Sequence, residues 1–291
     1  MKKTLLIIAT LLQLLSAEVP FWTNDAKRMG LRDPFELAMQ YAEFDKTKKD
    51  AEKGDIQAAY TLGTYYRNGF ATEIDYDKAV SWLKVAAREK HKEAAGILGY
   101  MYEKGQGVYQ NFYEAVRWYR IAVDKGDPLS MSRLADLLLF GDMRVRDVSD
   151  AVKLYVKASK LGNVNAIRNL GTMYAIGKGV KKNLSKAAAL YEEAAKQGDT
   201  KAAFNIGVSY IKGWGVDVDI EQAIKWLTRA SDNGHADAKC ILANRYASGD
   251  GILRDLSMAV QLATEGHQLG GKFCKKVWMK FKLYELAKEK Q

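Results

Sequence analysis

Apolar side chains recur at helical spacing through most of the chain. Ala59, Leu62, Gly63 and Tyr66 lie three or four residues apart, and the same spacing returns from Ala203 onwards. Residues with this spacing share one face of an α-helix, so the pattern predicts an amphipathic helix at each of these places.

A second predicted helix follows each of these first helices. Ala79, Val80, Leu83 and Ala86 keep helical spacing in the first example. An Asp or Asn stands at the expected start of every second helix, where its side chain can accept hydrogen bonds from the free amides of the first turn. The six positions are Asp75, Asn111, Asp147, Asn183, Asp219 and Asp255.

The helix pairs form a repeat of 36 residues. A glycine precedes each first helix at this interval, except at Lys90, and we expect it to take the left-handed conformation that ends the preceding helix. These glycines are Gly54, Gly126, Gly162, Gly198, Gly234 and Gly270. The repeat predicts six units, at residues 54–89, 90–125, 126–161, 162–197, 198–233 and 234–269.

One helix pair of this size cannot bury its apolar face, whereas stacked pairs share a continuous core. The expected fold is therefore an all-α, α/α solenoid of six helix-turn-helix units. The terminal units of such an array need capping. Phe35 to Ala51 predicts an N-terminal cap helix within residues 18–53, and residues 270–291 predict a basic C-terminal cap helix.

Three recurring strings carry a resemblance to a known family. They are Ala-Ala-x-x-Leu-Gly-x-x-Tyr from Ala58, the turn Gly-x-Gly-Val from Gly105, and Asp/Asn-x-x-x-Ala-x-x-Trp from Asp75. With them, residues 54–269 resemble the Sel-one-like repeat (SLR) family, a relative of the tetratricopeptide repeats. The third unit departs most, since Met143-Arg-Val replaces the second glycine of the turn and Ala135 replaces the first-helix glycine. The resemblance implies a curved, right-handed superhelix that acts as a protein-interaction scaffold.

Composition and charge exclude several classes of protein and partner. Hydrophobic residues make up 48% and charged residues 27%, which excludes a disordered chain, and two cysteines exclude a disulfide-dense mini-domain. The net charge is +10, and residues 270–291 hold seven lysines and two glutamates. This basic end indicates either a solvated cap helix or a membrane-surface module. Because the charge is localised, nucleic acid is not an expected partner.

The first 17 residues have the plan of a secretory signal peptide. Lys2 and Lys3 precede an apolar run from Leu5 to Leu15, and small residues end at Ala17. The run of about 11 residues is shorter than the roughly 20 that a membrane span needs. We expect a cleaved signal peptide at residues 1–17 and a periplasmic or secreted product.

Reactive side chains do not converge in the predicted fold. His91 and His235 hold equivalent positions four units apart, and no ligand cluster surrounds His267, so we expect no metal site. The Gly-x-Gly turns lack the third glycine and the preceding strand of a dinucleotide-binding loop. We therefore expect no cofactor, no catalytic site and no enzyme.

Matches to two motifs keep an enzyme as the alternative. Ser81-Trp-Leu-Lys84 and Ser209-Tyr-Ile-Lys212 match S-x-x-K, and Ser231-Asp-Asn233 matches S-D-N, which are elements of penicillin-binding enzymes. They fall on predicted helices without the α/β context of those enzymes. A cysteine-rich branch of the SLR family has been credited with binding or hydrolysing β-lactams. A cell-wall-related or β-lactam-binding enzyme is therefore the alternative function.

The only thiols, Cys240 and Cys274, fall on neighbouring first helices. Helix axes about 8–10 Å apart strain the Cα separation of roughly 7 Å that a disulfide tolerates. The pair is either a disulfide that staples the C-terminal cap or two buried free thiols.

A stripe on each first helix remains free of the stacking pattern. It occupies positions i, i+3, i+7 and i+10, beginning at Gln57 in the first unit, and resemblance to tetratricopeptide repeats places it in a concave groove. Its mixture of charged, amide and apolar side chains suits a protein or an extended peptide. Tyr60, Tyr100 and Arg168 are the strongest candidates, because aromatic and Arg side chains dominate binding hot spots. The full candidate set is Tyr60, Thr64, Arg67, Tyr100, Glu103, Asp136, Arg168, Phe204 and Asn244.

The sequence thus predicts an exported scaffold that binds another protein. Such a scaffold would assemble or regulate an envelope complex, or act as a host-interaction factor.

Overall fold

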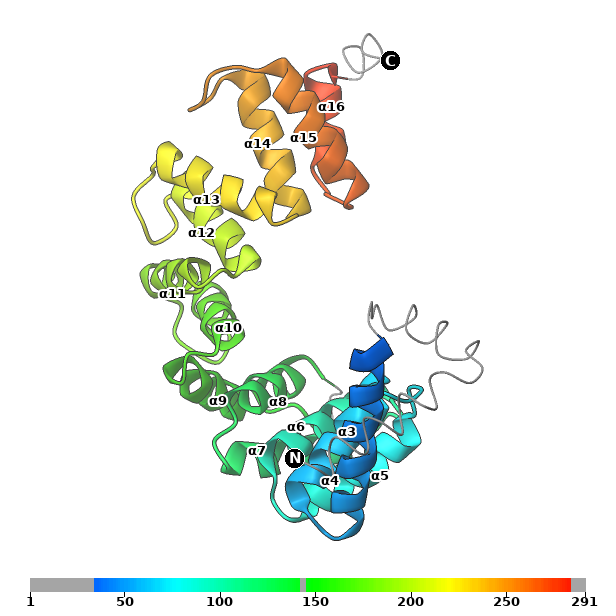
Figure 1. The fold of residues 1–291 in the computed structure, drawn as a ribbon. Helices are drawn as coiled ribbons and strands as arrows, with labels where there is room; N and C mark the ends of the chain where they lie inside the picture. Colours follow the sequence, from blue (N-terminus) through cyan, green and yellow to red (C-terminus); the bar gives the residue numbers. More distant parts are fainter. Residues whose placement is uncertain (1–33, 142–144, 284–291) are drawn as a thin grey trace. The chain divides into compact units, whose positions relative to one another are not determined.

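A computed structural model describes residues 34–141 and 145–283, and the regular elements of these ranges are α-helices (Figure 1). The all-α prediction is confirmed. The expected signal peptide at residues 1–17 and the third-unit turn at Met143 lie outside the described residues.

The helices recur in pairs at intervals of 36 residues. A long helix, α3 (Pro34–Glu52), precedes the pairs, and a short one, α16 (Cys274–Lys280), follows them. The first helices are α4 (Ile56–Asn68), α6 (Lys92–Lys104), α8 (Pro128–Phe140), α10 (Val164–Ile176), α12 (Thr200–Lys212) and α14 (Ala236–Ser248). The second helices are α5 (Tyr76–Arg88), α7 (Phe112–Asp124), α9 (Val148–Lys160), α11 (Leu184–Lys196), α13 (Ile220–Asp232) and α15 (Leu256–Gln268).

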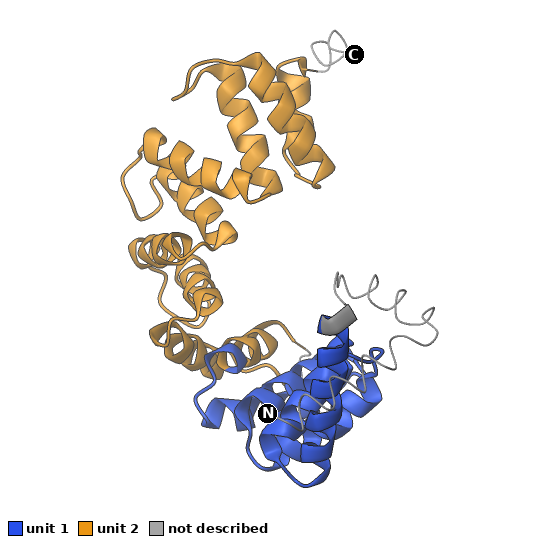
Figure 2. Cartoon of the chain, in the orientation of Figure 1, with its two compact units in different colours: residues 1–130 blue, residues 131–291 orange. Residues whose placement is uncertain are grey.

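The chain divides into two compact units, residues 1–130 and 131–291, with the boundary inside α8 (Figure 2). In the first unit, α3 packs on α4 and each later helix packs on the next, around a core that includes Leu62, Leu83 and Leu98. In the second unit, α9 to α15 pack in the same sequential way, and α16 packs on both α14 and α15. Its core includes Ile206 and Leu227.

Glycine allows the two helices of a pair to approach closely. A Cβ on Gly63 would lie 2.7 Å from Leu83 Cγ, and one on Gly99 would lie 2.5 Å from Tyr119 Cδ1. Real Cβ atoms do not approach that closely, so any side chain at these positions would push the second helix away.

Side-chain caps fix both ends of the repeat. All six Asp or Asn residues predicted to start second helices accept a hydrogen bond from a first-turn amide, as Asp75 does from Lys78 N at 2.9 Å. The glycines that follow the second helices have positive φ, as predicted. Lys90 takes the same conformation with φ of 62°, at the steric cost that a glycine would avoid.

The expected C-terminal cap helix is interrupted within the described residues. The sequence predicts a helix through residues 270–290, but α16 begins at Cys274, two residues later than the repeat spacing requires, and ends at Lys280. Gly271 occupies the capping position, and Phe273 at the helix start makes no side-chain cap. Lys282 has φ of 52°, which interrupts the helix, Leu283 is again helical, and residues 284–291 lie outside the described ranges. In the described ranges, no helix has the length and apolar character needed to cross a membrane.

Candidate functional site

The expected binding stripe lies on the first helices, and its positions differ in exposure. The residue that opens the stripe is exposed on α4, α6, α8, α10 and α12, as Asn165 and Lys201 are, and half-buried on α14. The later positions are half-buried or buried on each of the six helices. The stripe therefore offers one exposed edge and a partly covered floor.

The second stripe position covers the cap of the next first helix. Tyr60 stacks on His91 with ring centroids 4.4 Å apart, and Phe204 stacks on His235 at 4.3 Å. Each histidine is an N-cap whose Nδ1 accepts a hydrogen bond from a first-turn amide, at 3.4 Å for His91 and 3.3 Å for His235. Arg168 holds the same stripe position and binds the next cap as an ion pair. Three of the predicted binding residues thus lie at contacts between neighbouring repeats.

Neutral imidazole is the form that can cap a helix in this way. Burial lowers the pKa of His235, and Lys201 lowers it further, while Asp237 acts in the opposite direction. The ring of Phe204 contributes to that burial. His235 therefore keeps an unprotonated Nδ1 to accept from Ala238 N near neutral pH.

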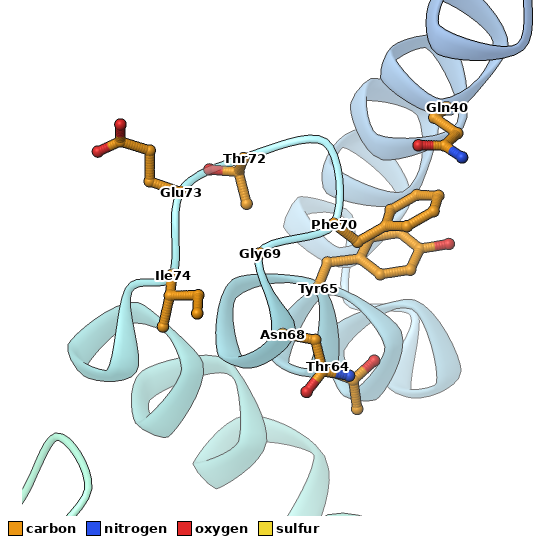
Figure 3. Close-up of a pocket in the computed structure, with 9 residues that line it drawn as sticks. All are labelled: Gln40, Thr64, Tyr65, Asn68, Gly69, Phe70, Thr72, Glu73 and Ile74. Carbon is orange, nitrogen blue, oxygen red and sulfur yellow. The ribbon is translucent and has the colours of Figure 1, made fainter. Parts of the chain in front are cut away.

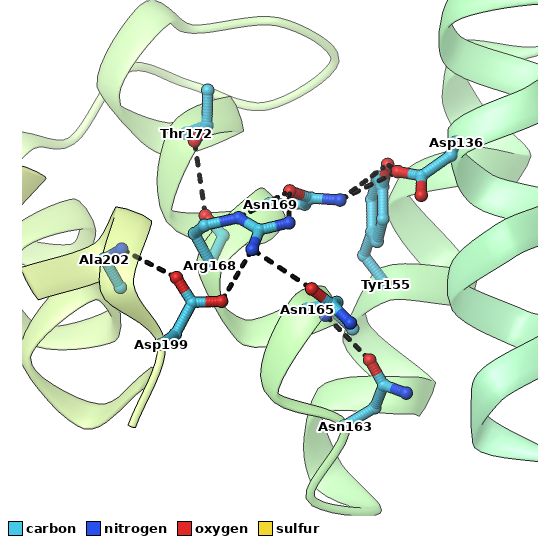
Figure 4. A network of polar contacts seen from close by, with 10 residues as sticks. Asp136, Tyr155, Asn163, Asn165, Arg168, Asn169, Thr172, Asp199 and Ala202 are labelled. Atoms are coloured by element: carbon cyan, nitrogen blue, oxygen red, sulfur yellow. Dashed lines mark hydrogen bonds and ion pairs between the residues drawn. The ribbon is translucent and has the colours of Figure 1, made fainter. Parts of the chain in front are cut away.

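Arg168 is the centre of a polar network (Figure 4). Its Nη1 donates to Asp199 Oδ2 at 2.6 Å, and only 16% of the Arg168 side chain and 9% of the Asp199 side chain are exposed. Its Nε and Nη2 donate to Asn169 Oδ1 at 3.2 and 3.0 Å. Asn169 Nδ2 donates to Asp136 Oδ1 at 2.7 Å, and the hydroxyl of Tyr155 donates to the same oxygen. The predicted residues Asp136 and Arg168 are therefore brought together through Asn169.

Tyrosines of the second helices reach the stripe from behind. The Tyr119 hydroxyl donates to Glu103 Oε2 at 2.8 Å, the Tyr155 hydroxyl donates to Asp136, and the Tyr191 hydroxyl donates to Thr172 Oγ1 at 3.2 Å. Burial raises the pKa of Tyr155 and of Tyr191, and the Asp136 carboxylate raises that of Tyr155 further. The three tyrosines share one repeat position, which sequence reasoning treated only as core. They hold the predicted residues Glu103 and Asp136 in place.

The other predicted residues on α4 and α6 contact their own helix or a neighbouring repeat. Thr64 Oγ1 donates to the carbonyl of Thr61 at 2.7 Å. The Arg67 guanidinium lies 5.9 Å from the centre of the Tyr100 ring, a cation–π distance. These side chains are half-buried, and Arg67 and Tyr100 belong to neighbouring repeats.

A depression of about 450 Å³, here called the C-terminal groove, lies on the stripe of the last first helices. It extends from α12 across α14 to α16 and includes the predicted residue Asn244. Val208, Ile211 and Cys240 are the other stripe residues of α12 and α14 in its wall. The full lining is Val208, Ile211, Lys212, Cys240, Ile241, Asn244, Arg245, Phe273, Lys276, Val277 and Lys280.

A disulfide joins Cys240 of α14 to Cys274 of α16, with the Cα atoms 4.7 Å apart. This decides between the two alternatives that the sequence left open. Two glycines make the close approach feasible, because a Cβ on Gly271 would lie 2.5 Å from Cys240 Sγ and one on Gly266 would lie 2.6 Å from Cys274 Sγ. The other repeats hold Ala at the position of Gly266 and a capping residue at that of Gly271. These two exceptions are the signal that could have predicted the bond.

Comparison with known proteins identifies the family to which the repeat belongs. The sequence profile of the Sel1 repeat matches residues 56–91, 92–127, 128–163, 164–199, 200–235 and 236–266. The chain belongs to the Sel1 repeat family. The predicted family resemblance is confirmed.

Two solved Sel1 repeat structures are similar over most of the chain. One is c5321, a protective antigen of uropathogenic Escherichia coli with an SLR fold, at 28% identity and a TM-score of 0.74. The match covers 79% of this chain but only 50% of the E. coli chain. The other is a Sel1 repeat protein of Oxalobacter formigenes, at 26% identity and a TM-score of 0.69, with 77% of this chain and 99% of that chain covered. A search of curated proteins finds no match.

A second depression, of about 760 Å³, lies at the N-terminal end of the Sel1 repeats (Figure 3). Gln40 of α3, Thr64 of α4 and the turn from Gly69 to Ile74 contribute to its wall. Tyr65 and Phe70 stack in it with ring centroids 4.3 Å apart. The Tyr65 hydroxyl donates to Glu43 Oε1 at 2.5 Å, and burial together with this carboxylate raises the Tyr65 pKa to about 12. The Tyr65 side chain is therefore fixed by α3.

The serines of the two S-x-x-K matches make ordinary helix contacts in these Sel1 repeats. Ser81 Oγ donates to the carbonyl of Asp77 and Ser209 Oγ to that of Asn205, both at 2.9 Å. Across residues 34–141 and 145–283, no three His, Cys, Asp or Glu side chains form a group that could hold a metal ion.

Proposed function

We propose that this Sel1 repeat protein is an exported scaffold that binds another protein, or an extended peptide of it, along the stripe of its first helices. In the cell it assembles or regulates an envelope complex or acts as a host-interaction factor. The C-terminal groove is the observation that carries this proposal, because four stripe residues of α12 and α14 line this hollow.

Two observations support export. The Cys240–Cys274 disulfide suits an oxidising compartment, and disulfides are rare in the reducing cytosol. The E. coli relative is described as a protective antigen, and an antigen must be met by the host. The apolar run and basic start of residues 1–17 agree with both.

The way the stripe is built supports protein binding over small-molecule binding. Its exposed edge bears amide and charged side chains, such as Asn165 and Lys201, spaced one repeat apart. A ligand that contacts several repeats must be extended, and repeat scaffolds present such surfaces to peptides and proteins.

Site-specific photocrosslinking in living cells tests the proposal. A photoreactive phenylalanine analogue replaces Lys201 on the stripe or, as the matched control, Lys225 on the exposed face of α13. Both sites are exposed lysines of one repeat, so neither substitution disturbs the core. We expect one discrete crosslinked protein from position 201 and none from position 225. Equal crosslinking from both positions, or none from position 201, would contradict binding along the stripe.

A further inference from the structure

We propose that the C-terminal groove binds an extended peptide segment in which acidic residues flank a large apolar side chain. This inference rests on the proposed function and names the chemistry of the partner at one end of the stripe.

The groove has an apolar floor. Val208, Ile211, Ile241 and Val277 line it together with Cys240. The volume of about 450 Å³ lies within the range of about 300–1,000 Å³ of known ligand pockets, and burying an apolar side chain there removes it from water. The floor therefore calls for an apolar anchor in the ligand.

The charged side chains that line the groove are all cationic. Lys212, Arg245, Lys276 and Lys280 line the groove, and no Asp or Glu is among the lining residues. Arg245 is paired with Asp250, whereas in the described ranges the three lysines have no carboxylate within ion-pair distance. Converging cations around a hollow attract an anionic ligand and repel a basic one.

A peptide fits this combination better than a membrane does. The apolar floor lies in a depression between helices, where a flat bilayer surface cannot reach it. The helix of the basic C-terminal segment, α16, has 7 residues, and its Cys274 and Val277 are buried. An extended chain can place a single apolar side chain in the hollow and leave carboxylates at the rim.

The walls of the groove are held in place before any ligand arrives. The disulfide fixes α16 to α14, and Asp237 Oδ1 accepts a hydrogen bond from Lys272 N at 2.8 Å just ahead of α16. A preorganised site loses less conformational entropy when it binds. The groove is therefore suited to recognition without rearrangement.

Fluorescence anisotropy with the full-length oxidised protein tests the proposal. The probe is fluorescein-labelled Gly-Ser-Glu-Asp-Leu-Phe-Glu-Asp-Ser-Gly. One comparison peptide replaces the four acidic residues by Lys, and another replaces Leu-Phe by Ser-Ser. We expect saturable binding of the first probe, weakened at least about tenfold in either comparison peptide, and further weakened by salt.

Charge-reversal variants locate the site. Lys276→Glu with Lys280→Glu reverses the rim, and Lys272→Glu with Lys275→Glu makes the same change in net charge at exposed positions outside the lining. We expect the first pair to weaken binding at least about tenfold and the second pair to change it less than about twofold. Circular dichroism checks that both variants fold alike.

Several results would overturn this inference. The first is equal binding of the acidic and basic probes, and the second is an equal loss of affinity in both double variants. The third is binding to phosphatidylglycerol vesicles without binding of the acidic probe. If Lys201 still yields its specific crosslink while the acidic probe fails, the scaffold function stands and only this assignment falls. If both fail, the stripe itself is not the binding surface.

Discussion

Two parts of the same stripe, both within residues 131–283, are built in opposite ways. Around Arg168 the stripe is filled by the network that joins Asp136, Asn169 and Asp199 (Figure 4). On α12 and α14 it is a hollow with apolar walls and a cationic rim. The helical framework is the same in both, so the difference lies in the side chains.

The facing second helix decides which form the stripe takes. The hydroxyls of Tyr155 on α9 and Tyr191 on α11 donate hydrogen bonds to polar residues of the stripe. The equivalent position holds Leu227 on α13 and Ala263 on α15, which offer no hydrogen bond. Val208 and Asn244 therefore meet no hydroxyl donor from this position of the second helix, and the stripe there stays open. A repeat scaffold can thus separate positions that hold it together from positions that bind.

The largest expected effect comes from removing the disulfide beside the C-terminal groove. Cys240→Ala with Cys274→Ala opens a crosslink between residues 34 apart, which chain-entropy arguments value at about 4 kcal/mol. We expect α16 to lose hydrogen-exchange protection while α10 and α11 keep theirs, because each repeat contacts only its neighbours. Equal loss of protection in α16 and in α10 and α11 would show that the disulfide does not stabilise the C-terminal part selectively.

The next largest effect falls on the filled part. Arg168→Ala leaves Asp199 almost buried and without its cation, which costs about 3 kcal/mol in comparable pairs. Asn at position 199 keeps the cap and removes the charge, so Asp199→Asn should recover much of the loss in the double variant. Urea unfolding of the four proteins gives the coupling energy. An Arg168→Ala effect below about 0.5 kcal/mol would mean that the network does not stabilise the fold.

A dependence on the disulfide is expected for substitutions at Gly266. In the oxidised protein, Gly266→Ala places a Cβ 2.6 Å from Cys274 Sγ and should destabilise by about 1–2 kcal/mol. In the protein with both cysteines changed to Ala, the sulfur contact is gone, but the Cβ would still lie 3.0 Å from the carbonyl oxygen of Ala236 and 3.1 Å from Lys239 Cβ. The same substitution should therefore cost less there than in the oxidised protein. Thermal melts of the four proteins measure both. An equal loss of stability in both backgrounds would show that Gly266 is not required by the disulfide.

The smallest effect depends on pH and tests the cap between α12 and α14. Since the pKa of His235 is lowered in the folded protein, the unfolded chain takes up a proton first as the pH falls below about 6.5. The free energy of unfolding therefore falls between that pH and the folded pKa, by an amount set by the difference between the two pKa values. His235→Asn keeps a capping side chain and should flatten this part of the pH profile. An unchanged slope in denaturant titrations would exclude His235 as its source.

Regular features of the fold could be predicted from the sequence, because they depend on local chemistry. Asp75 and its five equivalents cap the helices where the repeat placed them, and Gly63 permits the close packing that its small size indicated. The helix pairs and their period follow from these residues. The late start of α16 does not, because it arises from the missing cap at Gly271.

The parts that escaped prediction depend on geometry between repeats. Typical helix-axis distances predict a strained bond between Cys240 and Cys274. The two glycines beside the sulfurs let the helices approach closely enough for it to form. Likewise, spacing placed Tyr60 and Arg168 on the stripe but could not show that this position meets the next cap. That contact is set by the angle at which one repeat follows another.

The match between the second stripe position and the following cap restricts how such a gene can recombine. An aromatic ring precedes a histidine at Tyr60–His91 and Phe204–His235, and a cation precedes a carboxylate at Arg168–Asp199. A duplication that set α12 behind a second copy of itself would put Phe204 against Asp199. A deletion of the same repeat would put Arg168 against His235. At these three junctions, exchanging a repeat without the start of its successor would break the matched contact.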